Sequence, residues 1–326
     1  MNQETKEKLA LFAENAQITK KEFSWNYVLV KQLAALLYTL ENKPVRCDAI
    51  RESYDLIKGS IGVFSTFRGN MSLCVAAMLS LENNRQDLIE RTLSAYELLK
   101  SAKFRSSDYL TVAAFQIAAH AEPTRIPQAV QRMRDFYDGM KVQRWFHTGE
   151  DDYIFAAMLG LSDIDAAAGT EHIEQLYRQL KPEFRGGNSV QALTQVLVLG
   201  GTRFGAAERV LALRDALKRQ KIRLDRADTL PSIGILALLP VDIDTIVSDM
   251  AEAQTFLRAQ KGFGGFSAVS TQELLLFVTA IVASGYADSN LLTASLSTSI
   301  ASILIAQEAA IIAASSSAAT IAATSN

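Results

Sequence analysis

The chain has 326 residues, and its 33 Lys and Arg nearly balance its 35 Asp and Glu, for a formal net charge of −2. A balance of this kind provides no overall field for nucleic acid or an anionic membrane, so we expect no nucleic-acid partner. Six prolines and 17 glycines are few for the many tight turns of a β-rich fold. Composition therefore favours a helical protein.

The first 23 residues are charged throughout and contain no apolar stretch of the kind that a secretion signal needs. Cys47 and Cys74 stand in no metal-binding spacing, and we interpret them as buried free thiols of a reducing compartment. Together these features predict a cytoplasmic protein.

A short marker recurs along the chain: an aromatic residue, two variable residues, an apolar residue and a lysine. It occurs at Tyr54–Lys58, Tyr96–Lys100, Tyr137–Lys141 and Tyr177–Lys181, so that successive tyrosines are 42, 41 and 40 residues apart. Self-similarity at such a period is the signature of a repeat architecture. We therefore predict a repeating unit of roughly 40 residues.

Each unit pairs an Ala-rich apolar helix with an amphipathic helix that ends in the next marker. In the amphipathic segment Ile126–Lys141, the apolar residues fall on one helical face. The predicted apolar helices cover Leu33–Leu40, Ser72–Leu81, Leu110–Ala119, Tyr153–Leu161, Val190–Leu199, Leu230–Leu239 and Leu274–Ala283. A helix that is apolar all round must be covered on several sides.

We therefore predict an all-α protein in which about seven helical hairpins, over residues 1–287, form one repeat domain. Two architectures would bury the apolar helices: an open α-solenoid, or hairpins closed into an α/α toroid. No sequence feature indicates closure, and we favour the solenoid slightly.

Residues 288–326 differ from the repeats because small and apolar residues dominate them. The 24 residues Leu291–Ala314 carry a single charge, Glu308, and are long enough to span a bilayer. However, six Ser and Thr lie within this segment, and no Lys or Arg follows Lys261 to anchor it. We expect no transmembrane span, and predict an apolar helix and tail packed on the repeats, with self-association as the other interpretation.

Four segments carry a resemblance to a known family: YVLVKQLAALLYTL (27–40), FSTFRGN (64–70), EDDYIFAAML (150–159) and IAQEAAIIAA (305–314). The chain resembles a bacterial family of uncharacterised proteins, domain of unknown function 4003, over nearly its whole length. The resemblance implies no activity and no catalytic residues. QKGFGGFS (260–267) is also similar to the QxxxGGF signature of α/α-toroid proteins such as prenyltransferase β-subunits and terpene cyclases, although it occurs here only once.

Acidic residues precede several predicted helices, where N-capping is the default interpretation because a carboxylate there accepts hydrogen bonds from free backbone N–H groups. This applies to the pairs Asp163–Asp165 and Asp242–Asp244, which could otherwise bind Mg²⁺, and to Asp108, Asp152 and Asp228.

The segment 145–153, WFHTGEDDY, is the richest in chemical groups. Trp145, His147, Glu150, Asp151 and Asp152 could bind a divalent metal or provide an acid–base pair. The alternative is a polar loop with capping acids and an aromatic side chain packed on the next hairpin.

In the equivalent loop two units earlier, Arg68 and Asn70 could hold an anion at a helix N-terminus, unless Arg68 stacks on Phe67 or pairs with an acid. Because hairpins stack in register, we expect all the candidate ligand-binding residues to line one edge of the array. They are Arg68, Asn70, Asp108, Tyr109, Trp145, His147, Glu150, Asp151, Asp152, Asn188 and Asp228.

These features favour a non-catalytic binding scaffold for a protein or peptide partner, because hairpin arrays present large variable surfaces. The alternative is an enzyme or lipid-binding protein with an α/α-toroid cavity that holds a small apolar ligand, with metal assistance as one form of the enzyme interpretation. No cofactor is predicted.

Overall fold

A computed structural model describes residues 1–24, 26, 28–62, 66–201, 205–265, 269–287, 303 and 306. Within these residues the chain forms fourteen α-helices and no strand, which confirms the all-α prediction. Most of the C-terminal segment 288–326, including the predicted helix, lies outside the described residues.

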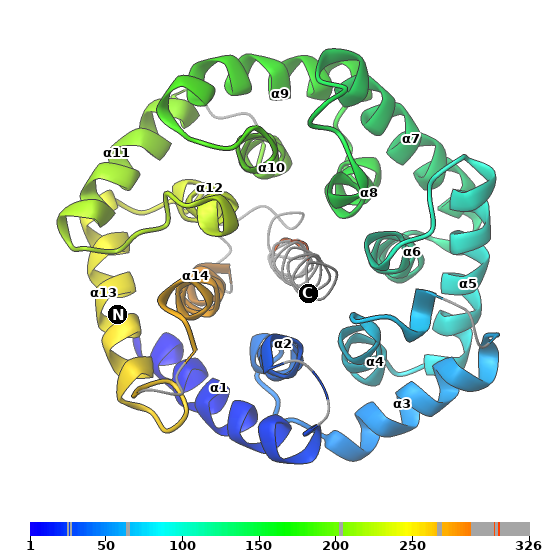
Figure 1. Cartoon of the computed structure of the whole chain (residues 1–326), viewed down its shortest axis with the longest axis horizontal. Coiled ribbons are helices and arrows are strands. Elements are labelled where there is room, and N and C mark those ends of the chain that lie inside the picture. The colour runs from blue at the N-terminus through cyan, green and yellow to red at the C-terminus, as the bar shows by residue number, and fades with distance from the viewer. Residues whose placement is uncertain are drawn as a thin grey trace, which may run out of the picture.

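The helices lie in two concentric layers, and the chain alternates between them (Figure 1). The outer layer consists of α1 (Gln3–Glu22), α3 (Cys47–Ser60), α5 (Arg85–Ser101), α7 (Ile126–Gln143), α9 (Ala166–Leu180), α11 (Ala206–Arg219) and α13 (Ile243–Ala259). The inner layer consists of α2 (Val28–Leu40), α4 (Ser72–Ser80), α6 (Asp108–His120), α8 (Tyr153–Leu161), α10 (Gly187–Leu199), α12 (Leu230–Ala237) and α14 (Thr271–Ala287).

The inner helices coincide with the predicted apolar segments, and α8 has the predicted bounds. Every residue of α4 is buried, as are all residues of α8 except Leu161. Burial on all sides explains why these helices lack the polar face that the outer helices have. The described C-terminal residues Ile303 and Ala306 are also buried, at 0% and 3% exposure.

Each of the two acidic pairs contains one N-cap residue, in agreement with the predicted capping role. Asp165 accepts a hydrogen bond from the Ala168 N–H at the start of α9, and Asp242 accepts one from the Thr245 N–H at the start of α13. These bonds satisfy N–H groups that have no partner within the helix.

The tyrosine–lysine marker has a physical basis at three of its four occurrences. The lysine ammonium lies over the ring of the tyrosine one turn earlier, at 4.2 Å for Tyr54–Lys58, 6.0 Å for Tyr96–Lys100 and 5.3 Å for Tyr137–Lys141. A cation is attracted to the negative face of an aromatic ring at such distances. At the fourth marker, Arg144 takes this place, 4.2 Å from the centroid of Tyr177.

Two arginines of the outer layer bind the C-terminal ends of inner helices. Arg132 of α7 donates to the carbonyls of Gly160, Ser162 and Ile164, at 2.6–2.9 Å. Arg209 of α11 makes the corresponding bonds to the carbonyls of Ala237, Leu239 and Val241, at 2.5–2.9 Å. A helix leaves its last carbonyls without internal partners and carries partial negative charge at this end, so each guanidinium caps a short buried helix.

The two ends of the hairpin series meet, because α1 packs against both α13 and α14 (Figure 1). Phe12 of α1 lies with its ring centroid 5.5 Å from that of Phe263 and 5.1 Å from that of Phe277. Lys6 forms an ion pair of 3.2 Å with Glu252 of α13. These contacts join residues that lie near opposite ends of the described helical region.

Replacement of Arg132 by leucine should lower the free energy of unfolding by about 2 kcal/mol, because charge-assisted bonds to the end of α8 are lost and buried carbonyls remain unpaired. Arg209→Leu should cost a similar amount at α12. Urea denaturation measures both losses, with the exposed Arg125 as the matched control. A change at Arg132 no larger than that of Arg125→Leu would contradict the capping role.

Candidate functional site

The N-terminal ends of neighbouring inner helices lie together at one face of the ring, which we call the entry face. It is defined by the first residues of α4, α6, α8, α10 and α12, namely Ser72, Asp108, Tyr153, Gly187 and Leu230. Contacts near these ends, described below, connect α6 to the start of α4 and α8 to α10. Most candidate residues named from the sequence lie on this face.

Where the starts of α4 and α6 meet, Asp108 does not cap its own helix, contrary to the default interpretation. Ser107 caps α6 by accepting from the Leu110 N–H at 3.2 Å, whereas the Asp108 carboxylate accepts from the backbone N–H groups of Asn70 and Met71 at the start of α4. The carboxylate lies so close to Gly69 that a Cβ there would be 2.1 Å from Asp108 Oδ1. Burial nevertheless raises the pKa of Asp108.

Asp152 is the most deeply buried of the candidate acids. Its Oδ1 accepts from the side-chain amides of Gln191 and Gln195 on α10, at 2.8 and 2.7 Å, and its Oδ2 accepts from the Gly149 N–H at 2.9 Å. It makes no capping bond to α8. Its carboxylate therefore joins the start of α8 to the buried side of α10.

Burial and the neighbouring Asp151 raise the pKa of Asp152 from its ordinary 3.8 to about 7. The amide donors oppose this rise only in part, because neutral donors compensate a buried charge less than water does. Gln195 Oε1 is buried and has no hydrogen-bond partner among the described residues. A rotation of this amide would present that oxygen to a protonated Asp152.

Arg144, which the sequence analysis did not single out, fixes the other side of this cluster. Its Nε donates to Gln191 Oε1 at 2.9 Å, its guanidinium pairs with the buried Glu174, and it lies over the ring of Tyr177. Because Gln191 Oε1 is held in this way, the Gln191 amide N–H₂ is directed toward Asp152.

A second chain of hydrogen bonds runs along the surface between the starts of α8 and α10. His147 Nδ1 lies 2.9 Å from Asn188 Oδ1, and Asn188 Nδ2 donates to Asp151 Oδ2 at 3.2 Å. The imidazole rests on Gly187, where a Cβ would lie 2.4 Å from the ring. His147 therefore reaches Asp151 through Asn188 and does not pair with an acid directly.

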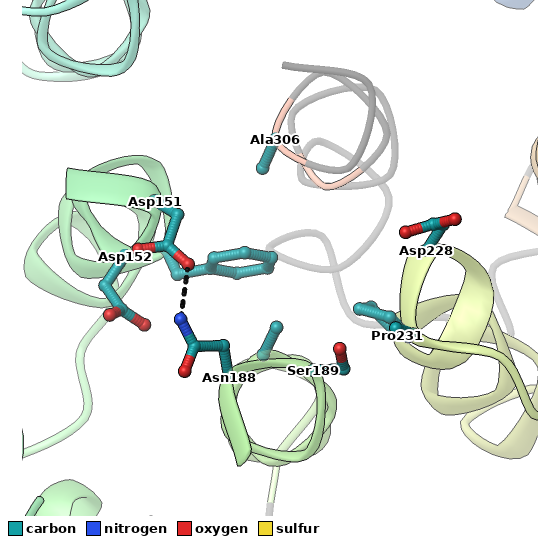
Figure 2. Close-up of a pocket in the computed structure, with 10 residues that line it drawn as sticks. Asp151, Asp152, Asn188, Ser189, Asp228, Pro231 and Ala306 are labelled. Atoms are coloured by element: carbon teal, nitrogen blue, oxygen red, sulfur yellow. Dashed lines mark hydrogen bonds between the residues drawn. The ribbon is translucent and has the colours of Figure 1, made fainter. Parts of the chain in front are cut away.

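A cavity of about 130 Å³ lies between the starts of α8, α10 and α12 (Figure 2). Asp151 and Asp228 lie on opposite sides of it, and Ala306 of the C-terminal segment adds to its wall. Three hairpins thus contribute to one cavity, whose lining includes Asp151, Asp152, Phe155, Asn188, Ser189, Asp228, Pro231 and Ala306.

The other candidate residues do not line this cavity. Tyr109 is partly buried close to Asp151 and Asp108, and burial followed by these charges raises its pKa. Glu150 lines a separate groove of about 560 Å³ between α5 and α7. Arg68 is exposed and donates to the Lys58 carbonyl at 3.1 Å.

Asn70 contributes its backbone N–H to Asp108, as described above. Trp145 contradicts the expectation that it packs on the next hairpin, because it is 64% exposed.

Within the described part of the chain, no three His, Cys, Asp or Glu side chains are grouped as a metal site would require. None of the helices described is long and apolar enough to cross a membrane. Cys47 and Cys74 are both buried, as predicted.

The sequence contains a pattern that could have indicated Gln191 and Gln195 as site residues. Two amides four residues apart interrupt the otherwise apolar segment Val190–Leu199, and this spacing places them on one helical face. No such pattern indicates Ala306, because it is one of many alanines in an apolar segment.

The raised pKa of Asp152 makes stability depend on pH. Its contribution is fully present below pH 4, where the carboxyl is protonated in both the folded and the unfolded state, and is lost as pH rises through 7. Asp152→Asn should therefore flatten the decrease in the free energy of unfolding between pH 4 and 8, measured by urea denaturation. The exposed Asp55→Asn is the control, and an unchanged slope for Asp152→Asn would contradict the burial argument.

Comparison with known proteins gives one match. A search of curated proteins and a search of solved structures found no match. The family model described as protein of unknown function (DUF4003) matches residues 15–310, which include the end of α1, every helix from α2 to α14 and every residue that lines the cavity. The chain therefore belongs to the DUF4003 family.

Proposed function

We propose that the protein is a closed α/α toroid of seven related hairpins, whose cavity at the entry face binds a small organic cation such as a primary amine or a guanidine. The contacts of α1 with α13 and α14 support closure. The matching carbonyl contacts of Arg132 and Arg209, two hairpins apart, support the repeat.

Closure makes the scaffold interpretation less suitable than the cavity interpretation. An open solenoid offers a concave surface to a peptide, whereas the concave surface of a ring faces inward. Ile303 and Ala306 are already buried there. The protein or peptide partner expected from the sequence would then have to bind elsewhere on the surface.

The observation that most directly supports a cationic ligand is the negative charge of the residues that line the cavity. Asp151 and Asp228 line it from two hairpins, while none of the described residues that line it is Lys, Arg or His. Asp151 accepts a side-chain hydrogen bond from the neutral amide of Asn188. A cation in the cavity would offset the cost of keeping the Asp151 carboxylate partly out of water and would also attract the exposed Asp228 carboxylate.

The size of the cavity limits the ligand. A cavity of about 150 Å³ in another protein holds one benzene molecule, so the volume here suits a ligand of roughly six heavy atoms. The ring of Phe155 and the side chains of Ala192 and Pro231 provide apolar wall for a short alkyl group. This combination fits an alkylamine or alkylguanidine better than the purely apolar ligand expected from the sequence.

Acid–base catalysis on the bound ligand is a second candidate, favoured by the adjacent carboxyls of Asp151 and Asp152. Burial raises the pKa of both, and that of Asp152 reaches about 7, where an acid can also act as a base. Only Asp151 would touch the ligand, with Asp152 as its buried neighbour. The burial of the Cys47 and Cys74 side chains is consistent with the cytoplasmic location expected from the sequence.

Isothermal titration calorimetry with methylguanidine and butylamine tests the cation proposal, with urea and acetate as neutral and anionic comparisons. Both cations should bind, and Asp151→Asn or Asp228→Asn should weaken binding about tenfold, because each removes one charge-assisted contact. Asp163→Asn, an exposed aspartate near the opposite end of α8, is the matched control. Equal binding of urea and methylguanidine, or unchanged affinity in both cavity variants, would refute the proposal.

We also propose that the C-terminal segment 288–326 fills the inside of the ring, supported by the burial of Ile303 and by Ala306 in the cavity wall. A chain that ends at residue 287 should then unfold at a lower temperature and bind an apolar fluorescent dye, since inner-helix surface becomes exposed. Calorimetry and dye fluorescence measure these effects. Unchanged folding and stability after the deletion would show that the segment does not fill the ring.

A further inference from the structure

Basic side chains gather where the outer helices end. Each outer helix carries Lys or Arg in its last turn, and each is followed by an inner helix, so these ends lie toward the entry face. The residues are Lys20 and Lys21, Lys58, Lys100, Lys141, Arg178, Lys218 and Arg219, and Arg258. Loop residues Lys103 and Arg105 add to them beside α5.

The loops at the opposite face, where the inner helices end, carry more carboxylates than bases among the described residues. The exposed acids there are Glu41, Glu82, Glu122, Asp163, Asp165 and Asp242, against Lys43, Arg46 and Arg125. Exposed acids also lie at the outer-helix ends, among them Glu22, Asp55, Glu97 and Asp138. The two faces therefore differ in proportion, with an excess of bases at the entry face and an excess of acids at the opposite face.

Large apolar side chains are exposed on the basic side of the ring. At the end of α7, Val142 is 84% exposed, Trp145 64% and Phe146 77%. The rings of Trp145 and Phe146 lie against each other, with centroids 3.5 Å apart. Folding leaves this pair in water, although burial of such rings is among the most favourable contributions that a side chain can make.

From this combination we infer that the entry face docks on an anionic lipid surface, with Trp145 and Phe146 inserted among the headgroups and the basic outer-helix ends against the lipid phosphates. The bases are spread around the whole ring, which suits a plane better than the groove that an extended acidic peptide would need. Trp and Phe flanked by Lys and Arg are the side chains that peripheral proteins place at the membrane interface. The inference does not depend on the ligand of the cavity.

The test uses the full-length chain with Trp25 replaced by phenylalanine, which leaves Trp145 as its single tryptophan. Vesicles of phosphatidylcholine mixed with phosphatidylglycerol should sediment the protein and shift its tryptophan emission to the blue, whereas pure phosphatidylcholine should do neither. High salt should release the protein, because screening weakens its attraction to anionic lipid.

Substitutions distinguish the contribution of the exposed aromatic side chains from that of the basic side chains. The double substitution Trp145→Ala and Phe146→Ala, in the wild-type background, should weaken sedimentation about tenfold or more, since it removes the apolar area that would be buried. Lys141→Glu with Lys103→Glu should weaken it comparably, whereas Lys43→Glu on the opposite face should have little effect.

Circular dichroism should show that each variant keeps its helical content, which is expected because the replaced side chains are exposed or at a loop. Equal binding to both vesicle types, or unchanged binding of the Trp145 and Phe146 variant, would overturn the inference. So would binding to immobilised polyglutamate but not to vesicles, which would assign the face to an acidic polypeptide.

Discussion

The structure depends on one constraint, the need to cover helices that are apolar all round. Each inner helix contacts an outer helix on one side and neighbouring inner helices on two others. In an open array the first and last inner helices would each leave one side in water, at a cost that grows with the apolar area exposed. The contact of α2 with α14 removes both costs together.

The same packing gives the entry face its chemistry. Short inner helices direct their N-terminal N–H groups to one side of the ring, where carboxylates are favoured by the helix dipole and disfavoured by burial. Asp108 and Asp152 meet both conditions, and each connects its own helix to a neighbouring one. The carboxylates that join helices and those that line the cavity are therefore both found at the N-terminal ends of the inner helices, where the helix dipole favours them.

Much of the fold could be predicted from the sequence because apolar periodicity and the tyrosine–lysine marker are local signals. The caps Asp165 and Asp242 followed from the same reasoning, since capping involves only neighbouring residues. The contact of α1 with α14, on which the proposed closure rests, could not be predicted, because no local pattern encodes a contact such as Phe12 with Phe277. For the same reason, the sequence placed Asp108 at its own helix end and could not indicate that it reaches Asn70 and Met71.

The site residues likewise divide into those that a local pattern indicates and those that depend on tertiary contacts. Asp151, Asn188 and Asp228 were named from their positions in equivalent loops, and they line one cavity. Arg144 was missed, because a single arginine in a loop has many possible partners and its contact with Glu174 is set by tertiary packing.

The contacts that join α1 to α13 and α14 also bear on how the molecule acquires its shape. During synthesis, the side of the first hairpin that carries Phe12 emerges long before Phe263 and Phe277 exist to cover it. Hairpins can form early from local contacts, but sealing the circle joins residues at a very large separation and carries a high loop-closure entropy. The first and last hairpins should therefore come together as a late step of folding. Before that step, both would expose apolar surface, which makes the intermediate prone to pair with another chain.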